Sequence, residues 1–175
     1  EGEAFYLPFG HALPGELDLG NTFGELPNLP ALTDERMRPL KDLLEDPSVR
    51  KVGQDLKHDL VALWRQGIAP AGLWFDTMVA SYVLDPGRRG HTLEALSLDL
   101  LAHKAIIRTD VTGKGQKQIS FAEVPLEQAR DYACDDVDCA VRLYARFEPE
   151  LVAQKVDRLF HELEMPLIQI GRAHV

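Results

Sequence analysis

The stretch LWFDTMVASYVL, Leu73 to Leu84, indicates a short strand that turns into a helix at Asp76. A carboxylate at such a turn accepts hydrogen bonds from the first N–H groups of the helix, so we interpret Asp76 as a cap rather than a ligand. The segment VRKVGQ, Val49 to Gln54, predicts an earlier strand, and a helix over 56–66 follows it with Asp55 as its cap. Strands that alternate with helices are typical of an α/β fold.

The rest of the chain predicts mainly helices. We expect them over 34–45 (capped by Thr33), 91–102, 126–147 and 151–168. A strand is expected over Ala4 to Phe9, followed by a Pro/Gly-rich loop over 14–30. Residues 103–121 have weak periodicity and contain GKGQKQ, which favours a flexible basic loop.

The length and composition predict one folded domain. The chain has 175 residues, of which 45% are apolar and 27% charged, as in ordinary globular proteins. No apolar run approaches the roughly 18 residues of a membrane span, so we expect a soluble, cytoplasmic monomer without a membrane partner. The net charge of −9 argues against coating nucleic acid by charge alone. A small basic patch, or divalent metals held by carboxylates, can still receive a phosphate backbone.

The stretch YACDDVDC, Tyr132 to Cys139, contains three aspartates within the longest predicted helix. Asp136 lies on the apolar face of that helix, and Tyr132 lies one turn before it. Asp135 and Asp138 lie about 100° and 200° away around the helix, so we expect them to be solvated. Cys134 and Cys139 are five residues apart, on different faces, which disfavours a disulfide or a zinc pair and favours buried, reduced thiols.

Asp59 repeats this anomaly, because it falls within the apolar stripe of the helix over 56–66. A buried carboxylate without compensation is costly, so each inward aspartate requires a cation, hydrogen-bond donors or a raised pKa. An arginine partner or a helix N-terminus would suffice for one such residue. Two of them on separate helices favour a shared site for Mg²⁺ or Mn²⁺, which prefer hard oxygen ligands. Two such ions roughly 4 Å apart can promote cleavage of a phosphodiester.

Five motifs occur in an order and spacing that resemble one known family. They are KVGQDLKHD (51–59), FDTMVASYVL (75–84), GKGQKQISF (113–121), YACDDVD (132–138) and EMPL (164–167). The chain resembles the 3′ to 5′ proofreading exonuclease domain of bacterial family A DNA polymerases, the polymerase I type. That resemblance implies a ribonuclease H-like fold, a mixed sheet flanked by helices, and two divalent metal ions, Mg²⁺ or Mn²⁺.

The resemblance also implies roles for individual residues. Asp59 matches the acid of the second exonuclease motif, while Tyr132 and Asp136 match the Tyr-x-x-x-Asp of the third. The two aspartates would hold the metals, and the tyrosine would help to position the attacking water. Gln54 and Asp55, with His58 beside them, match the segment that holds the 3′ end of the single strand, although the family usually has Asn at position 55 and often Tyr at 58.

Basic residues outside these motifs are candidates for phosphate contacts. The candidates are Arg88, Arg89, Lys114 and Lys117, although exposed basic residues more often serve only solubility. Arg108 lies where many family members carry an aromatic residue, so it receives no role. His91 and His103 match family positions and are expected to be structural.

The family's first motif, an Asp-x-Glu on the first strand that supplies two further acids, has no match here. We therefore expect the first strands and two metal ligands to precede Glu1, and the piece alone to be inactive and marginally folded. Residues 1–150 would form the exonuclease domain, and 151–169 would lead into the polymerase domain of the same chain. Residues 170–175 do not continue the helical pattern and are expected to be a non-native tail.

The expected function is metal-dependent removal of mispaired nucleotides from a single-stranded DNA 3′ end during replication and repair. An RNA exonuclease of the ribonuclease D type is the nearest alternative, and EMPL and the GKGQKQ loop argue against it. A non-catalytic scaffold within a polymerase remains open because of the missing first motif.

Overall fold

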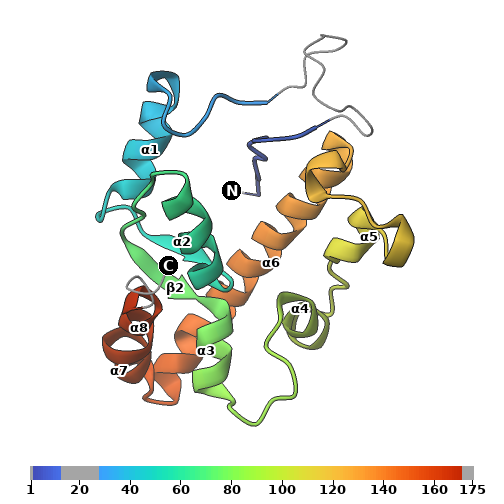
Figure 1. Ribbon diagram of the computed structural model, residues 1–175. Coiled ribbons are helices and arrows are strands. Elements are labelled where there is room, and N and C mark those ends of the chain that lie inside the picture. The colour runs from blue at the N-terminus through green and yellow to red at the C-terminus, as the bar shows by residue number, and fades with distance from the viewer. Residues whose placement is uncertain (1, 13–27, 171–175) are drawn as a thin grey trace, which may run out of the picture.

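The predicted α/β arrangement is present in the computed structural model, which describes residues 2–12 and 28–170 (Figure 1). Two parallel strands, β1 (Lys51–Gly53) and β2 (Leu73–Asp76), form the sheet of this part of the chain. The antiparallel strand that a mixed sheet requires is not among the described residues. Most of the expected 14–30 loop and of the expected 170–175 tail lies outside them as well.

Helices make up most of the structure. In chain order they are η1 (Glu35–Met37), α1 (Arg38–Glu45), α2 (Leu56–Arg65), α3 (Thr77–Leu84), α4 (Leu93–Leu101), α5 (Arg108–Thr112), η2 (Gly115–Lys117), η3 (Phe121–Glu123), α6 (Leu126–Ala153), α7 (Asp157–Leu159), η4 (Phe160–Glu164, a π-helix) and α8 (Met165–Ile170). Within the described ranges, none of them has the combined length and apolar character needed to cross a bilayer.

The long helix α6 lies at the centre of this arrangement. It packs against β1, α3, α4 and α5, and Figure 1 shows it as the orange helix that crosses the molecule. Phe75 on β2 is fully buried and meets the ring of Phe160 at 4.6 Å and that of Tyr144 at 4.9 Å. Leu143 and Leu151 on α6 are also fully buried. The aromatic contacts therefore join the sheet to both α6 and the C-terminal helices.

The predicted N-terminal strand is wrong. Residues 4–9 form no ladder within the described structure, and Phe5 is 82% exposed. Among the described residues, the backbone of this segment accepts one bond, at Pro8, from the N–H of Leu29 at 2.8 Å. Alternating apolar residues make a strand only where another strand supplies hydrogen bonds, and none lies beside this one in the described chain.

Three helical boundaries also differ from the prediction. The first helix is capped by Asp34, whose carboxylate accepts the Arg36 N–H at 3.0 Å, and not by Thr33. The weakly periodic segment 103–121 contains the short helices α5 and η2, not only a loop. The long helix continues to Ala153, so the predicted helix over 151–168 is in fact the end of α6 followed by α7, η4 and α8.

The carboxylate of Asp76 caps two helices at once. As predicted, it caps α3, accepting the N–H groups of Met78 at 2.9 Å and Val79 at 3.2 Å. It also accepts the N–H groups of Leu56 at 2.8 Å and Asp55 at 3.2 Å at the start of α2. The side chain of Asp55 makes no cap bond, so that prediction is wrong; its left-handed backbone (φ 54°, ψ 50°) leaves the capping to Asp76.

Replacing Asp76 should therefore destabilise both helix starts together. Asp76 is only 1% exposed, so Asp76→Ala leaves four backbone donors without their acceptor. We expect the free energy of unfolding to fall by about 3 kcal/mol or more, measured by urea denaturation.

The matched control is Asp46→Ala, which removes a carboxylate that accepts the Ser48 N–H at 2.8 Å in an exposed turn. It should have a far smaller effect, because water replaces the lost bond there. Equal effects of the two substitutions would contradict the capping role of Asp76.

Candidate active site

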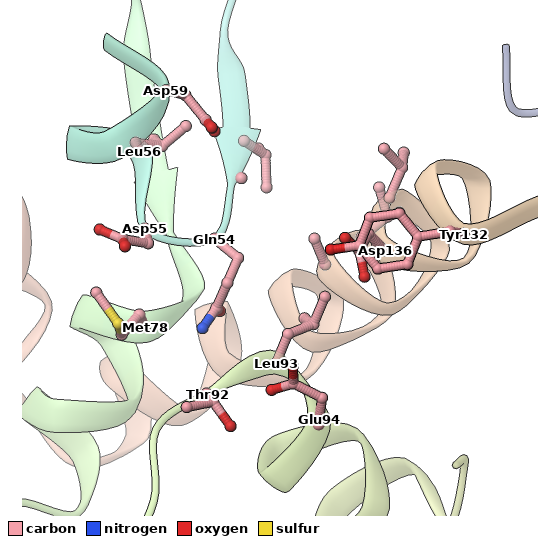
Figure 2. A pocket seen from close by; sticks show the side chains of 15 residues that line it. Gln54, Asp55, Leu56, Asp59, Met78, Thr92, Leu93, Glu94, Tyr132 and Asp136 are labelled. Carbon is pink, nitrogen blue, oxygen red and sulfur yellow. The ribbon is translucent and has the colours of Figure 1, made fainter. Parts of the chain in front are cut away.

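A cleft of about 470 Å³ lies between α2, the start of α4 and one face of α6. Three of the predicted site residues, Asp59, Tyr132 and Asp136, line it together. Figure 2 shows Asp59 on α2 and the other two on α6, on facing sides of the cleft. The structure thus brings together side chains that are more than seventy positions apart in the sequence.

Asp59 lies in the first turn of α2, at the mouth of the cleft. Leu56 and Leu60 on the same helix are buried, whereas the Asp59 side chain is 58% exposed, so it borders the core and does not lie within it. Partial removal from water raises the pKa of Asp59 to about 6, and the charges of Asp55 and Asp76 add to this effect. His58, whose Nδ1 lies 3.9 Å from the Asp59 carboxylate, lowers it.

The end of β1 approaches Asp59 closely at Gly53. A Cβ atom at this position would lie 2.6 Å from the side chain of Leu56 and 4.0 Å from the Asp59 carboxylate. A larger residue at this position would therefore require the Leu56 side chain to shift. The end of the strand and the first turn of α2 thus lie against each other next to Asp59.

Asp136 and Tyr132 face the cleft from successive turns of α6, and both are half-buried. Burial raises the pKa of Asp136 to about 6; the hydrogen bond from Tyr132 lowers it, and the charges of Asp135, Glu94 and Asp59 raise it. Burial and the adjacent Asp136 raise the pKa of Tyr132 to about 12. The tyrosine is therefore a neutral hydroxyl at physiological pH.

Aromatic packing fixes the Tyr132 ring. The Phe121 and Tyr132 rings meet in a T-shaped arrangement with a centroid separation of 5.7 Å, and the Arg108 guanidinium lies 5.5 Å from the Phe121 ring centroid. Arg108 also lowers the pKa of Tyr132 by its positive charge. The hydroxyl is thereby held toward Asp136.

Glu94 is a residue of the cleft that the sequence interpretation missed. It lies in the first turn of α4, lines the cleft, and contributes to the raised pKa values of Asp136 and Tyr132. Thr92 caps that helix, its hydroxyl accepting the Ala95 N–H at 3.4 Å. The sequence predicted the helix that contains Glu94, but no local pattern shows that the first turn of this helix faces α6.

The charge and donor atoms of the cleft fit a hard divalent cation. Its lining contains carboxylates and, among the described residues, no Lys, Arg or His. Carboxylates with raised pKa values lack nearby compensation, which a bound cation supplies. Within residues 2–12 and 28–170, neither Asp59 nor Asp136 belongs to a group of three possible ligands (His, Cys, Asp or Glu) whose atoms all lie within 4.8 Å of one another. The cleft therefore fits a cation by its charge and by the type of its ligands, and not by a ready-made set of ligand distances.

The residues predicted to hold the DNA 3′ end lie beside these acids. Gln54 and Asp55 line the cleft. The Gln54 amide donates to the His91 carbonyl at 2.9 Å and accepts from the Thr77 hydroxyl, so this side chain ties β1 to the segment before α4. His58 is 79% exposed, next to Asp59.

The predicted phosphate-contacting residues are not part of the cleft lining. Arg88 is 21% exposed and pairs with Asp99 at 3.3 Å and with Asp85 at 3.8 Å. Arg89 and Lys114 are exposed. His91 is buried, and its Nδ1 pairs with the Ser81 hydroxyl at 2.8 Å, as expected for a structural histidine.

The two aspartates expected to be solvated behave differently. Asp138 is 59% exposed and pairs with Arg142 at 3.3 Å, as predicted. Asp135 is only 15% exposed; it lies 2.7 Å from His103 Nε2 and accepts the Ile106 N–H at 2.7 Å. The prediction for Asp135 is wrong because the segment after α4 covers that side of the helix.

Comparison with known proteins shows which proteins the chain is similar to. A family model described as "3'-5' exonuclease" matches residues 26–152. Proteins named DNA polymerase I from Pseudomonas aeruginosa (38% identity) and Rhizobium leguminosarum (40%) match 97% and 75% of the chain. The chain spans only 18% and 13% of their lengths.

One solved structure supports the fold alone. It is described as the POL domain of Pol1 from M. smegmatis in complex with DNA primer-template and dNTP. It superposes with a TM-score of 0.56 at 24% identity, over 78% of this chain and 20% of that one. The predicted fold class is confirmed.

The raised pKa of Asp136 predicts that this residue lowers stability at neutral pH. Its value of about 6 exceeds the ordinary 3.8, so between these pH values the native chain binds more protons than the unfolded chain. The free energy of unfolding therefore falls as pH rises through this interval. Asp136→Asn lacks the charge and should be more stable near pH 7 by about 1 kcal/mol, after allowance for solvent screening.

The gain should fade below about pH 4, where Asp136 is protonated in both states. Denaturation midpoints measured across this range test the prediction. Asp138→Asn, on the exposed face of the same helix, is the control and should show no such gain. A gain for Asp136→Asn that does not depend on pH would contradict the assignment.

Proposed function

Because the chain belongs to the family of 3′-5′ exonuclease domains of DNA polymerase I, we propose that it hydrolyses the terminal phosphodiester bond at a DNA 3′ end. The products are a nucleoside 5′-monophosphate and a strand one residue shorter, so the activity edits mispaired ends for a polymerase. The observation that carries this proposal is the placement of the Asp59 and Asp136 carboxylates and the Tyr132 hydroxyl around one cleft, whose lining contains no Lys, Arg or His from the described part of the chain.

Asp59 and Asp136 are the residues that would hold two divalent ions, Mg²⁺ or Mn²⁺. When bound, such ions activate water and stabilise the leaving oxygen of a phosphodiester. The carboxylates suit this role because each is short of positive charge in the free chain, as their pKa values of about 6 indicate. A bound cation would offset the repulsion among the acids, so that Asp59 and Asp136 would both stay ionised.

Tyr132 has a separate role. With a pKa of about 12 it keeps its proton at neutral pH, and its hydrogen bond with Asp136 fixes the hydroxyl at the edge of the acids. A neutral hydroxyl can both donate and accept a hydrogen bond, which suits it to orient the attacking water.

The frayed single strand would enter across the end of β1. We propose that Gln54 and Asp55 border the terminal nucleotide and that His58 lies beside it, since the first two line the cleft and the third is exposed next to Asp59. Arg89 and Lys114 are exposed and so accessible to backbone phosphates further along the strand. Arg88 would have to leave Asp85 and Asp99 to contribute.

The similarity to DNA polymerase I also suggests how the chain is divided into domains. We propose that residues 1–150 act as the editing domain and that 151–169 lead toward a polymerase domain of the same chain, acting in the cytoplasm as a monomer. In support, the DNA polymerase I relatives from P. aeruginosa and R. leguminosarum are several times longer than the segment matched here.

Asp136→Ala should abolish editing without affecting synthesis. The test replaces the matching segment of a DNA polymerase I relative with this chain and measures both activities. We expect release of nucleoside monophosphate from a mispaired DNA 3′ end to fall about 100-fold or more, because a metal ligand is lost. Primer extension should be unchanged.

Asp138→Ala, two residues away on the exposed face, is the matched control and should retain both activities. Normal editing by the Asp136 variant would contradict the assignment of the site. Extension without editing by the unsubstituted graft would favour a non-catalytic scaffold. Faster removal from an RNA 3′ end than from DNA would favour the ribonuclease D type.

Tyr132→Phe should separate positioning from metal binding. The ring, and hence its packing against Phe121, is preserved while the hydroxyl is lost. In the same graft we expect kcat to fall about 100-fold with little change in KM, since water is less well oriented. Tyr144→Phe is the control, because that hydroxyl donates to Glu148 at 2.9 Å, away from the cleft. An unchanged kcat for Tyr132→Phe would exclude the role.

A further inference from the structure

A second group of metal-ligating side chains lies on α6, separate from the acids of the cleft. Asp135 and Cys139, one helical turn apart, meet His103 from the link between α4 and α5. The imidazole nitrogen, the carboxylate oxygen and the thiol sulfur all lie within 4.8 Å of one another. The proposed exonuclease chemistry uses none of these three residues.

Backbone hydrogen bonds hold the His103 and Asp135 ligands in place. The N–H of His103 donates to the Ser97 carbonyl at 3.1 Å, after a left-handed residue, Ala102 (φ 51°). One oxygen of Asp135 accepts the Ile106 N–H at 2.7 Å, and the other lies 2.7 Å from His103 Nε2. Such outer contacts are what orient metal ligands in proteins.

A buried serine lies next to the third of these groups. Ser97 is fully buried, and its Oγ lies beside the Cys139 thiol, which is also fully buried. A side-chain hydrogen bond between the two lowers the pKa of the thiol, and Ser97 Oγ has no other partner within the described chain. Because a thiol is a weak hydrogen-bonding group, the buried hydroxyl is poorly satisfied by it.

We propose that His103, Asp135 and Cys139 bind a single Zn²⁺ ion, with Ser97 Oγ or a water in the fourth position. A set of one nitrogen, one oxygen and one sulfur ligand suits zinc, whereas Mg²⁺ and Mn²⁺ prefer oxygen alone. Cysteine binds zinc as a thiolate, so the ion would take the place of the Cys139 thiol proton.

The expected role of this ion is structural. It would join α6, which carries Tyr132 and Asp136, to the link that leads into α5. Arg108, at the start of α5, contacts the Phe121 ring that packs on Tyr132. Binding to the native state alone would raise the stability of the whole chain.

Co²⁺ titration of the purified, reduced chain tests the proposal, because a thiolate ligand gives cobalt a charge-transfer absorption that carboxylates do not. We expect this band to saturate at one ion per chain. Cys139→Ser should abolish it, and His103→Gln, which alters a side chain that is 35% exposed, should weaken binding about 100-fold or more. Zn²⁺ should displace the cobalt and raise the Tm of the unsubstituted chain.

Two controls isolate the site. Cys134→Ser removes the other thiol and should retain the band, and Asp136→Asn should retain it because the cleft acids are not its ligands. Absence of the band in the unsubstituted chain would overturn the proposal, as would its persistence in Cys139→Ser. Loss of the band in Cys134→Ser would also overturn it, since the thiol would then be the wrong one.

Discussion

A single buried carboxylate, that of Asp76, joins the two strand-to-helix turns on which the cleft depends. It accepts N–H groups from the first turns of both α2 and α3. This is possible because β1 and β2 are parallel with Gly53 opposite Asp76, so both helices begin at the same edge of the sheet. The capped start of α2 then places Asp59 one turn further on, over Gly53, at the mouth of the cleft.

The acids of the cleft oppose the stability that this cap provides. Asp59 and Asp136 both have pKa values of about 6, which means that keeping them ionised at neutral pH costs free energy. Under the proposed function, the same unmatched charge would favour the binding of a divalent cation there. Stability and metal affinity would then be set against each other by the same two side chains, a conflict common at active sites.

Local signals predicted much of this structure, and non-local contacts account for the errors. Helical periodicity predicted that Asp136 faces inward, and the position of Asp76 between a strand and a helix predicted that it is a cap. Periodicity gives the direction of a side chain around its helix, but it does not show which distant segment packs there. Asp135 was therefore expected in solvent, whereas the link after α4 covers it. Asp55 failed as a cap because its backbone is left-handed, and the carboxylate of Asp76, twenty-one residues away, accepts the N–H groups at the start of α2 instead.

The rotational position of α6 about its own axis determines where Asp136 and Tyr132 point. Asp135 and Asp136 differ by about 100° around this helix, so fixing one direction fixes the other. Ala129, Leu143 and Phe147 are buried and hold the helix against the core, but apolar packing tolerates small rotations better than directional bonds do. His103 supplies such a bond through Asp135. The contact on one side of α6 thereby sets how Asp136 and Tyr132 face the cleft on the other.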